Sequence, residues 1–254
     1  MSRAHVVYGL HAVREILGRA PESVLVVIAA RGAGNQHLAE LIEAAQRFGI
    51  HVEQAARPRL DRLTGGGRHQ GIMARVRPRP VRAADLFELL DGLDEPPLLL
   101  ALDRVTDPRN LGACLRTADA GGVHAVVVPR DRAVGLTPAA RKAACGAAET
   151  IPLMQVTNLA RTLRALKDAQ VRIVGAAADA RASPHAVDLS GPLCLVCGAE
   201  DTGLRRLTRE HCDEFVALPM RGSVASLNVA VAAGVLIYEA RRQREFVEFG
   251  DIPH

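Results

Sequence analysis

The residues best suited to chemistry in this chain come directly before its last long apolar segment. Ser223, Ser226 and Asn228 fall within six positions, and residues 229–235 after them carry no side chain that can form a hydrogen bond. A helix of such small apolar residues packs tightly and holds the preceding loop in place, while the free N–H groups at its start face outward. This contrast predicts a ligand site at the start of the helix.

A second segment, at residues 107–122, is built in the same way and reads DPRNLGACLRTADAGG. Asn110 precedes a predicted short helix that carries Arg116, and Gly121 with Gly122 ends that helix. The two segments together place amide, hydroxyl and guanidinium groups beside apolar helices. Such groups can orient a hydroxyl or a phosphate of a ligand.

The elements that must position these groups follow from the apolar pattern. Residues 98–254 alternate continuous apolar strands with helices, which predicts a parallel sheet covered on both faces. Ligands of such sheets bind beyond the carboxyl ends of the strands. The predicted strands are 98–102, 124–128, 151–156, 171–176, 193–197 and 215–218, and the predicted helices are 111–120, 137–148, 158–169, 203–211 and 226–247.

Three of these strands lead into polar turns at 103–110, 198–203 and 219–226, so we expect all three turns at one edge of the sheet. No strand is followed by a GxGxxG or GxxxxGK[ST] pattern, which argues against a dinucleotide or P-loop site.

The N-terminal part is predicted to form a small α/β sandwich. Pro78, Pro80, Pro96 and Pro97 then interrupt regular structure and mark a linker with one helical turn near residues 84–90. The expected domains are 1–78, a linker 79–97 and 98–254. The N-terminal helices are predicted at 9–18, 35–48 and 58–64, and the strands at 24–29, 50–54 and 70–76.

Charge is concentrated at the N-terminal end. The chain has 254 residues and a net charge of +4, whereas residues 1–78 alone hold 11 arginines against six acidic residues. Arginine grips phosphate in a planar fork, but the same excess also fits an ordinary solvated surface. Aromatic residues make up 3%, so recognition of RNA by base stacking is disfavoured and contacts to shape and phosphate are favoured.

Cysteine usage and hydropathy fit a cytoplasmic protein. Five cysteines with no signal peptide predict free thiols. The sequence has no apolar run of about 18 residues, so no membrane span is predicted. Cys194 and Cys197 lie in one apolar strand, which would point them to opposite faces, so no metal site is expected there. His69 is interpreted as a turn or strand-entry residue.

At these turns the chain resembles the SpoU (TrmH) family of RNA ribose 2′-O-methyltransferases. YGLHAV at 8–13 and HQGI at 69–72 extend the resemblance over nearly the whole chain, while Asp201 and Thr202 depart from the usual second motif. The motifs are Asn110 to Arg116 within NLGACLRTADA, Gly198-x-Glu200-x-x-Gly203-Leu204, and Pro219-Met220 with Ser223-x-x-Ser226-Leu227-Asn228-Val229-Ala230.

The resemblance implies a SPOUT domain with a deep trefoil knot, a homodimer, and S-adenosylmethionine as methyl donor to a guanosine ribose of 23S rRNA or its large-subunit precursor. The N-terminal domain would capture RNA, with phosphate contacts from Arg57, Arg59, Arg62 and Arg68. By the same resemblance the catalytic and RNA-contacting positions are Asn110, Arg116, Glu200, Ser226 and Asn228, and the backbone positions for the donor are Gly198, Leu218 and Leu227.

Structural interpretations stand beside these functional ones. Asn110, Ser226 and Asn228 suit helix caps, and Glu200 suits the start of a helix dipole. Arg116 and the N-terminal arginines suit solvated surfaces. Because arginine keeps its proton in proteins, we expect Arg116 to position ribose and phosphate while water or Glu200 takes the proton. The rival functions are a methyltransferase for tRNA or antibiotic resistance, and a ribosome-assembly factor without catalysis.

Overall fold

The computed structural model describes residues 5–32, 36–77, 85–131, 133–199 and 202–244, which form two compact units. The first unit comprises Met1–Pro80 and the second Val81–His254. The domain bounds expected from the sequence stay predictions. In the described part of the chain, no helix is both long and apolar enough to cross a membrane.

The first unit has a four-stranded sheet in the order β1-β4-β2-β3, in which only β2 and β3 run parallel. Helices α1 and α2 cover one face and Leu60 of α3 is buried on the other. Strand β1 escaped the sequence prediction because it is a four-residue edge strand. The elements are β1 His5–Tyr8, α1 Leu10–Arg19, η1 Pro21–Ser23, β2 Val24–Ala30, α2 Gln36–Arg47, β3 Val52–Ala55, α3 Arg57–Leu63 and β4 Ile72–Val76.

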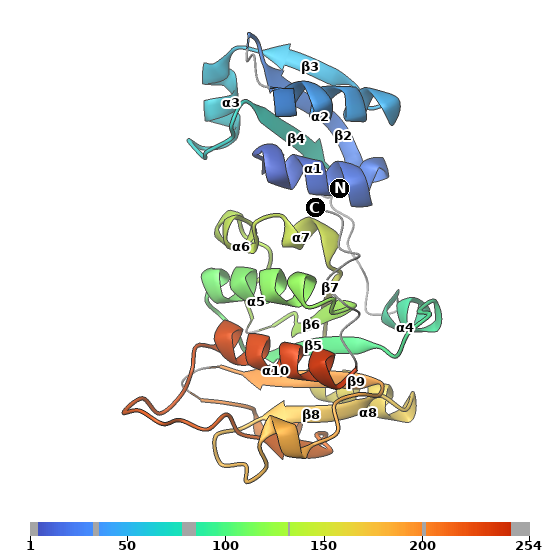
Figure 1. Cartoon of the computed structure of the whole chain (residues 1–254), viewed down its shortest axis with the longest axis vertical. Helices are drawn as coiled ribbons and strands as arrows, with labels where there is room; N and C mark the ends of the chain where they lie inside the picture. The colour runs from blue at the N-terminus through green and yellow to red at the C-terminus, as the bar shows by residue number, and fades with distance from the viewer. Residues whose placement is uncertain (1–4, 33–35, 78–84, 132, 200–201, 245–254) are drawn as a thin grey trace. The chain divides into compact units, whose positions relative to one another are not determined.

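The second unit is built on six parallel strands in the order β10-β8-β9-β5-β6-β7, which confirms the predicted fold class (Figure 1). The deep knot stays a prediction. The elements are α4 Asp85–Asp91, β5 Leu98–Asp103, α5 Pro108–Ala120, β6 Ala125–Pro129, α6 Pro138–Ala144, α7 Ala147–Thr150, β7 Leu153–Val156, α8 Leu159–Asp168, β8 Arg172–Ala176, η2 Pro184–Ala186, β9 Leu193–Gly198, α9 Arg206–Arg209, β10 Glu214–Val216 and α10 Val229–Gln243.

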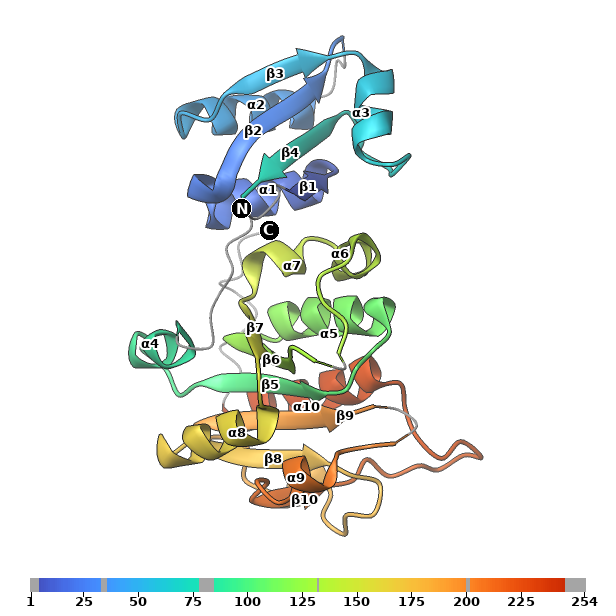
Figure 2. The same ribbon diagram turned by 180° about the vertical axis from the view of Figure 1, so that it is seen from behind.

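Helices cover both faces of this sheet, as a buried parallel sheet requires. Helices α5 and α10 lie on one face and α8 on the other (Figures 1 and 2). Cys197 packs in the core on the α5 and α10 side of the sheet, and Cys194 packs in the core on the α8 side. The two thiols therefore point to opposite faces, as predicted. Leu86 of α4, a helix within the predicted linker, is buried in the core on the α8 side.

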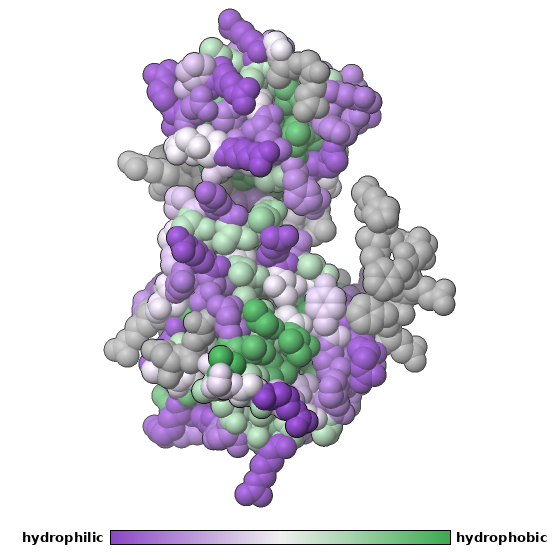
Figure 3. All heavy atoms as spheres, turned by 60° about the vertical axis from the view of Figure 1, so that its left-hand side comes forward, coloured by the Kyte–Doolittle hydropathy of each residue, from purple (hydrophilic) through white to green (hydrophobic). Residues whose placement is uncertain are grey.

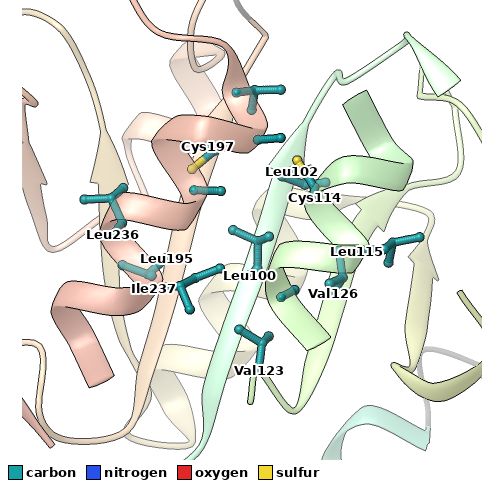
Figure 4. Close-up of a cluster of buried hydrophobic side chains, with 14 of the residues drawn as sticks. Leu100, Leu102, Cys114, Leu115, Val123, Val126, Leu195, Cys197, Leu236 and Ile237 are labelled. Atoms are coloured by element: carbon teal, nitrogen blue, oxygen red, sulfur yellow. The ribbon is translucent and has the colours of Figure 1, made fainter. Parts of the chain in front are cut away.

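Glycines bring α5 and α10 into close contact. A Cβ added to Gly121 would lie 2.2 Å from Cγ2 of Ile237, and one added to Gly234 would lie 3.1 Å from Cγ2 of Thr117. Thr117 lies opposite Gly234 and Gly121 lies opposite Ile237, so residue numbers rise in the same direction along both helices. The two helices therefore run parallel. Figure 4 shows apolar side chains of both helices, including Leu115 and Ile237, gathered around the strands.

Three helix predictions need correction. The helix predicted at 137–148 is broken into α6 and α7, because Cys145 and Gly146 both have left-handed backbones with φ of 52° and 103°. The helix predicted at 203–211 shrinks to α9, since Gly203 adopts φ 61° in a turn. The last helix begins at Val229 rather than at residue 226, because Asn228 caps it.

Candidate functional site at the carboxyl edge of the sheet

The starts of α5 and α10 meet at the carboxyl edge of the sheet. Nδ2 of Asn228 donates a hydrogen bond of 2.9 Å to Oδ1 of Asn110, although 118 residues separate the two in the chain. Both amides are at least partly accessible to solvent. The structure therefore joins two predicted site residues from different motifs into one polar pair.

Asn228 has a second task as the cap of α10. Its Oδ1 accepts a hydrogen bond of 2.9 Å from the backbone N–H of Ala230. A cap of this kind satisfies a free N–H group at the helix start. The bond also fixes which end of the Asn228 amide turns toward Asn110, so the structural and functional interpretations of Asn228 are compatible.

Asn110 is not the cap of α5, contrary to the structural interpretation of the sequence. The helix begins at Pro108, and Asp107 caps it by accepting a hydrogen bond of 2.8 Å from the N–H of Arg109. Asn110 therefore lies inside the first helical turn, and its side chain is not needed as the cap. The Asp-Pro pair was the sequence signal for this start, since proline favours the first helical position.

The turn after β9 is closed on itself. Gly203 donates a backbone hydrogen bond of 2.8 Å to Ala199, and a Cβ on Gly198 would lie 2.2 Å from the backbone carbon of Gly203. Gly198 is thus required by a close approach of the chain to itself. Glu200, the predicted catalytic carboxylate, lies outside the described residues.

An ion pair that was not predicted from the sequence joins the end of β5 to the residues just after this turn. Asp103, the last residue of β5, has an exposed fraction of 0% and accepts hydrogen bonds from the backbone N and Nε of Arg205, at 2.9 and 2.7 Å. Asp103 and Gly198 are also register partners across β5 and β9. An aspartate ending an otherwise apolar strand was the available signal, but its partner 102 residues away was not.

Arg116 is exposed on α5, and its Nη1 lies 3.6 Å from Sγ of Cys145. The break between α6 and α7 places that thiol there, because Cys145 is the first of the two residues with a left-handed backbone at the break. The guanidinium is therefore held at the surface by a weak contact. Within the described residues, its other N–H groups form no hydrogen bond and can serve a ligand.

The remaining predicted positions lie around the same edge. Ser226 is exposed in the loop before α10, and Leu227 is half-buried. Leu218, just beyond β10, is half-buried against the core shared by α5 and α10. Figure 1 shows the loop before α10 extending past the tips of the strands.

The predicted RNA contacts of the first unit gather on and after α3. Arg57, Arg59, Arg62 and Arg68 are all exposed, but Arg59 forms an ion pair with Glu53 and is partly neutralised. His69 is buried: it bonds Asp61 at 2.9 Å and accepts the backbone N–H of Gly71 at 3.0 Å. These bonds support its interpretation as a structural residue.

The fold and the site together define the second unit as an α/β domain whose polar loops gather at one edge of a parallel sheet, the usual ligand edge of such folds. The sequence profile of the SpoU rRNA methylase family matches residues 97–238. A second profile, for RNA 2′-O ribose methyltransferase substrate binding, matches residues 6–81. The chain belongs to the SpoU rRNA methylase family.

Similar proteins span both units. The 23S rRNA (guanosine-2′-O-)-methyltransferase RlmB of Escherichia coli is 51% identical over 95% of this chain and 99% of its own length. The Yersinia pestis protein of the same name is 52% identical over 95% and 98%. The SpoU methyltransferase AviRb from Streptomyces viridochromogenes, solved in complex with AdoMet, is 25% identical with a TM-score of 0.77 over 95% of this chain and 90% of its own.

Proposed function

We propose that the protein methylates the ribose 2′-hydroxyl of a guanosine in 23S rRNA, with S-adenosylmethionine as donor. The observation that carries this proposal is the 51% identity to the Escherichia coli enzyme over 95% of the chain. The bonded pair Asn110 and Asn228 supports it, because two separate motifs of the family meet there. The reaction belongs to the cytoplasm, where ribosomal RNA is made and assembled in bacteria.

The carboxyl edge fits the methyl donor chemically. An adenine ring needs apolar cover and backbone hydrogen bonds, and Leu218 and Leu227 offer half-buried apolar side chains there. Gly198 presents backbone free of a side chain at the turn after β9. We assign the backbone of Gly198, Leu218 and Leu227 to donor binding. When bound, the donor supplies a methyl group on a positively charged sulfur.

The protein's own task is then to align a weak nucleophile and accommodate one proton. The Asn110 amide, held by Asn228, is suited to orient the ribose hydroxyl. Arg116 is suited to bind the adjacent phosphate, and Ser226 to contact the RNA beside it. The hydroxyl proton passes to water or to the carboxylate of Glu200. Arg116→Lys should lose most turnover, because a lysine cannot reproduce the guanidinium fork.

Capture of RNA falls to the first unit. Arg57, Arg62 and Arg68 are exposed there, and Arg59 is exposed but paired with Glu53. Affinity for 23S rRNA should therefore fall steeply with salt, and Arg57→Glu with Arg62→Glu should flatten that dependence. Arg59→Glu should act less, since its charge is already partly balanced. An unchanged salt slope in the first variant would remove α3 from the RNA footprint.

A homodimer through α10 completes the proposal. Val231, Val235 and Tyr238 are 52%, 45% and 47% exposed and recur on one side of the helix. Figure 3 shows a continuous apolar area on the second unit. Such an area favours a protein partner, and the family resemblance points to a second copy. Val235→Arg should produce monomers in light scattering, whereas exposed Leu207→Arg on α9 should leave the mass unchanged.

The test of function is transfer of labelled methyl to 23S rRNA and to tRNA, followed by mapping of the modified nucleotide. Label on a guanosine ribose of 23S rRNA is expected, and Asn110→Ala should abolish it. Label on tRNA alone would overturn the substrate assignment. Calorimetry with S-adenosylmethionine separates an enzyme from an assembly factor, since a protein without a donor site releases no heat of donor binding.

A further inference from the structure

Arg104 adopts a backbone that arginine rarely takes. It follows the last residue of β5 and has φ 62°, in the left-handed region that glycine occupies without strain. Strained residues persist where surrounding contacts hold them, and they concentrate at functional sites. The position of Arg104, at the edge that carries the three family motifs, makes its side chain the feature to explain.

The side chain reaches across to the turn after β9. Its Nη2 donates a hydrogen bond of 2.6 Å to Oγ1 of Thr202, one residue before Gly203. Within the described part of the chain, the buried Nε of Arg104 has no hydrogen-bond partner. A strained backbone and an unsatisfied buried N–H both oppose this conformation, so it is not explained as a device that stabilises the fold.

Asp103, the last residue of β5, and Arg104, the residue after it, therefore both bind the segment that follows β9. Asp103 binds Arg205 after the turn, in a pair whose carboxylate is fully buried. Arg104 binds Thr202 within it, in a contact exposed to solvent. The buried pair anchors Arg205, whereas Arg104 holds Thr202.

We propose that Arg104 is a positioning residue for the methyl donor: through Thr202 it holds the backbone of Gly203 against that of Gly198, in the form that binds S-adenosylmethionine. The inference rests on the proposed function, which assigns the backbone of Gly198 to the donor. Neither Arg104 nor Thr202 is one of the motif residues that carry the family resemblance, so the contact is additional to those motifs.

The decisive variant is Arg104→Gly, because glycine adopts the observed φ freely. Its urea midpoint should equal or exceed that of the wild type, while the dissociation constant for S-adenosylmethionine in calorimetry should rise by about tenfold, the loss of one charge-assisted hydrogen bond. Gln170→Gly is the matched control: Gln170 also has a left-handed φ of 61°, but it precedes β8 at the other end of the strands. That control should leave donor affinity unchanged.

Thr202→Val tests the route through the hydroxyl. It should weaken donor binding as much as Arg104→Gly, and the double variant should be no weaker than either single one. Multiplying effects would overturn the inference, as would unchanged donor affinity in Arg104→Gly or a fall in its urea midpoint. A wild-type protein that binds no donor would instead overturn the proposed function, so the two failures are distinguishable.

Discussion

Replacing Asn228 by aspartate should separate the stability of α10 from the activity of the site. An aspartate caps a helix as well as asparagine does, and its charge at the helix start contributes about 0.3 to 1 kcal/mol. The bond from Asn228 to Asn110 is lost, which costs about 0.5 to 1.5 kcal/mol. These two effects nearly cancel, so the free energy of unfolding should change by less than about 1 kcal/mol.

Activity should respond differently. A carboxylate has no N–H to donate, so Asn110 can restore a hydrogen bond only by turning its amide over. Rotating the amide by about 180° exchanges the oxygen and nitrogen that Asn110 presents to the ribose. We expect turnover to fall by about 10- to 100-fold, the usual effect of a misplaced orienting group.

The assay is methyl transfer to 23S rRNA beside urea unfolding of the same preparations. Asn228→Ala is the comparison, because it removes the cap to Ala230 and should cost about 1 kcal/mol of stability in addition to activity. Wild-type turnover in Asn228→Asp would refute the orienting role of the pair. A stability loss equal to that of Asn228→Ala would refute the assignment of the cap.

Three further predictions concern the rest of the second unit. Asp103→Ala should lower the free energy of unfolding by about 3 kcal/mol in urea, because it leaves Arg205 without its buried partner; a loss below 1 kcal/mol would contradict the role of the pair. The bond from Arg242 lowers the pKa of Glu239 to about 2, so the stability that Glu239 confers over Glu239→Gln should be complete above pH 4.5 and disappear as the pH falls to 2; a pH-independent difference in melting temperature would exclude it. Burial raises the pKa of Cys197 and Cys212 to about 12, whereas Cys145 is exposed, so a thiol reagent should label Cys145 first and Cys145→Ser should remove that fast phase.

Most of this fold is readable from the sequence because its strands are buried on both faces. Continuous apolar runs such as residues 98–102 and 193–197 give a strong signal, and parallel strands bring their carboxyl ends to one edge. The same pattern predicts that the turns next to Asn110 and Asn228 lie together, and the hydrogen bond between the two amides agrees with it. The pattern failed where the backbone conformation of one residue decides the outcome, as at Cys145, which splits a predicted helix.

Contacts over long sequence separation were out of reach for a different reason. Asp103 and Arg205 each look ordinary in sequence, and only the pairing of β5 with β9 brings them together. Arg104 was missed likewise, because a left-handed φ is foreseeable for glycine and not for arginine. The cap of α5 could have been predicted, since the Asp-Pro signal at residue 107 was present.

Gly121 and Gly234 allow α5 and α10 to pack closely, and substitutions at the two positions should change the distance between the helices by different amounts. An alanine at residue 121 would force the helices apart, since its methyl group overlaps Ile237. An alanine at residue 234 would ask Thr117 to yield by only a few tenths of an ångström. Alanine at residue 121 should therefore change the spacing of the helices that carry Asn110 and Asn228 by a large amount, and alanine at residue 234 by a small one. Neither substitution adds a charge or touches the reacting atoms.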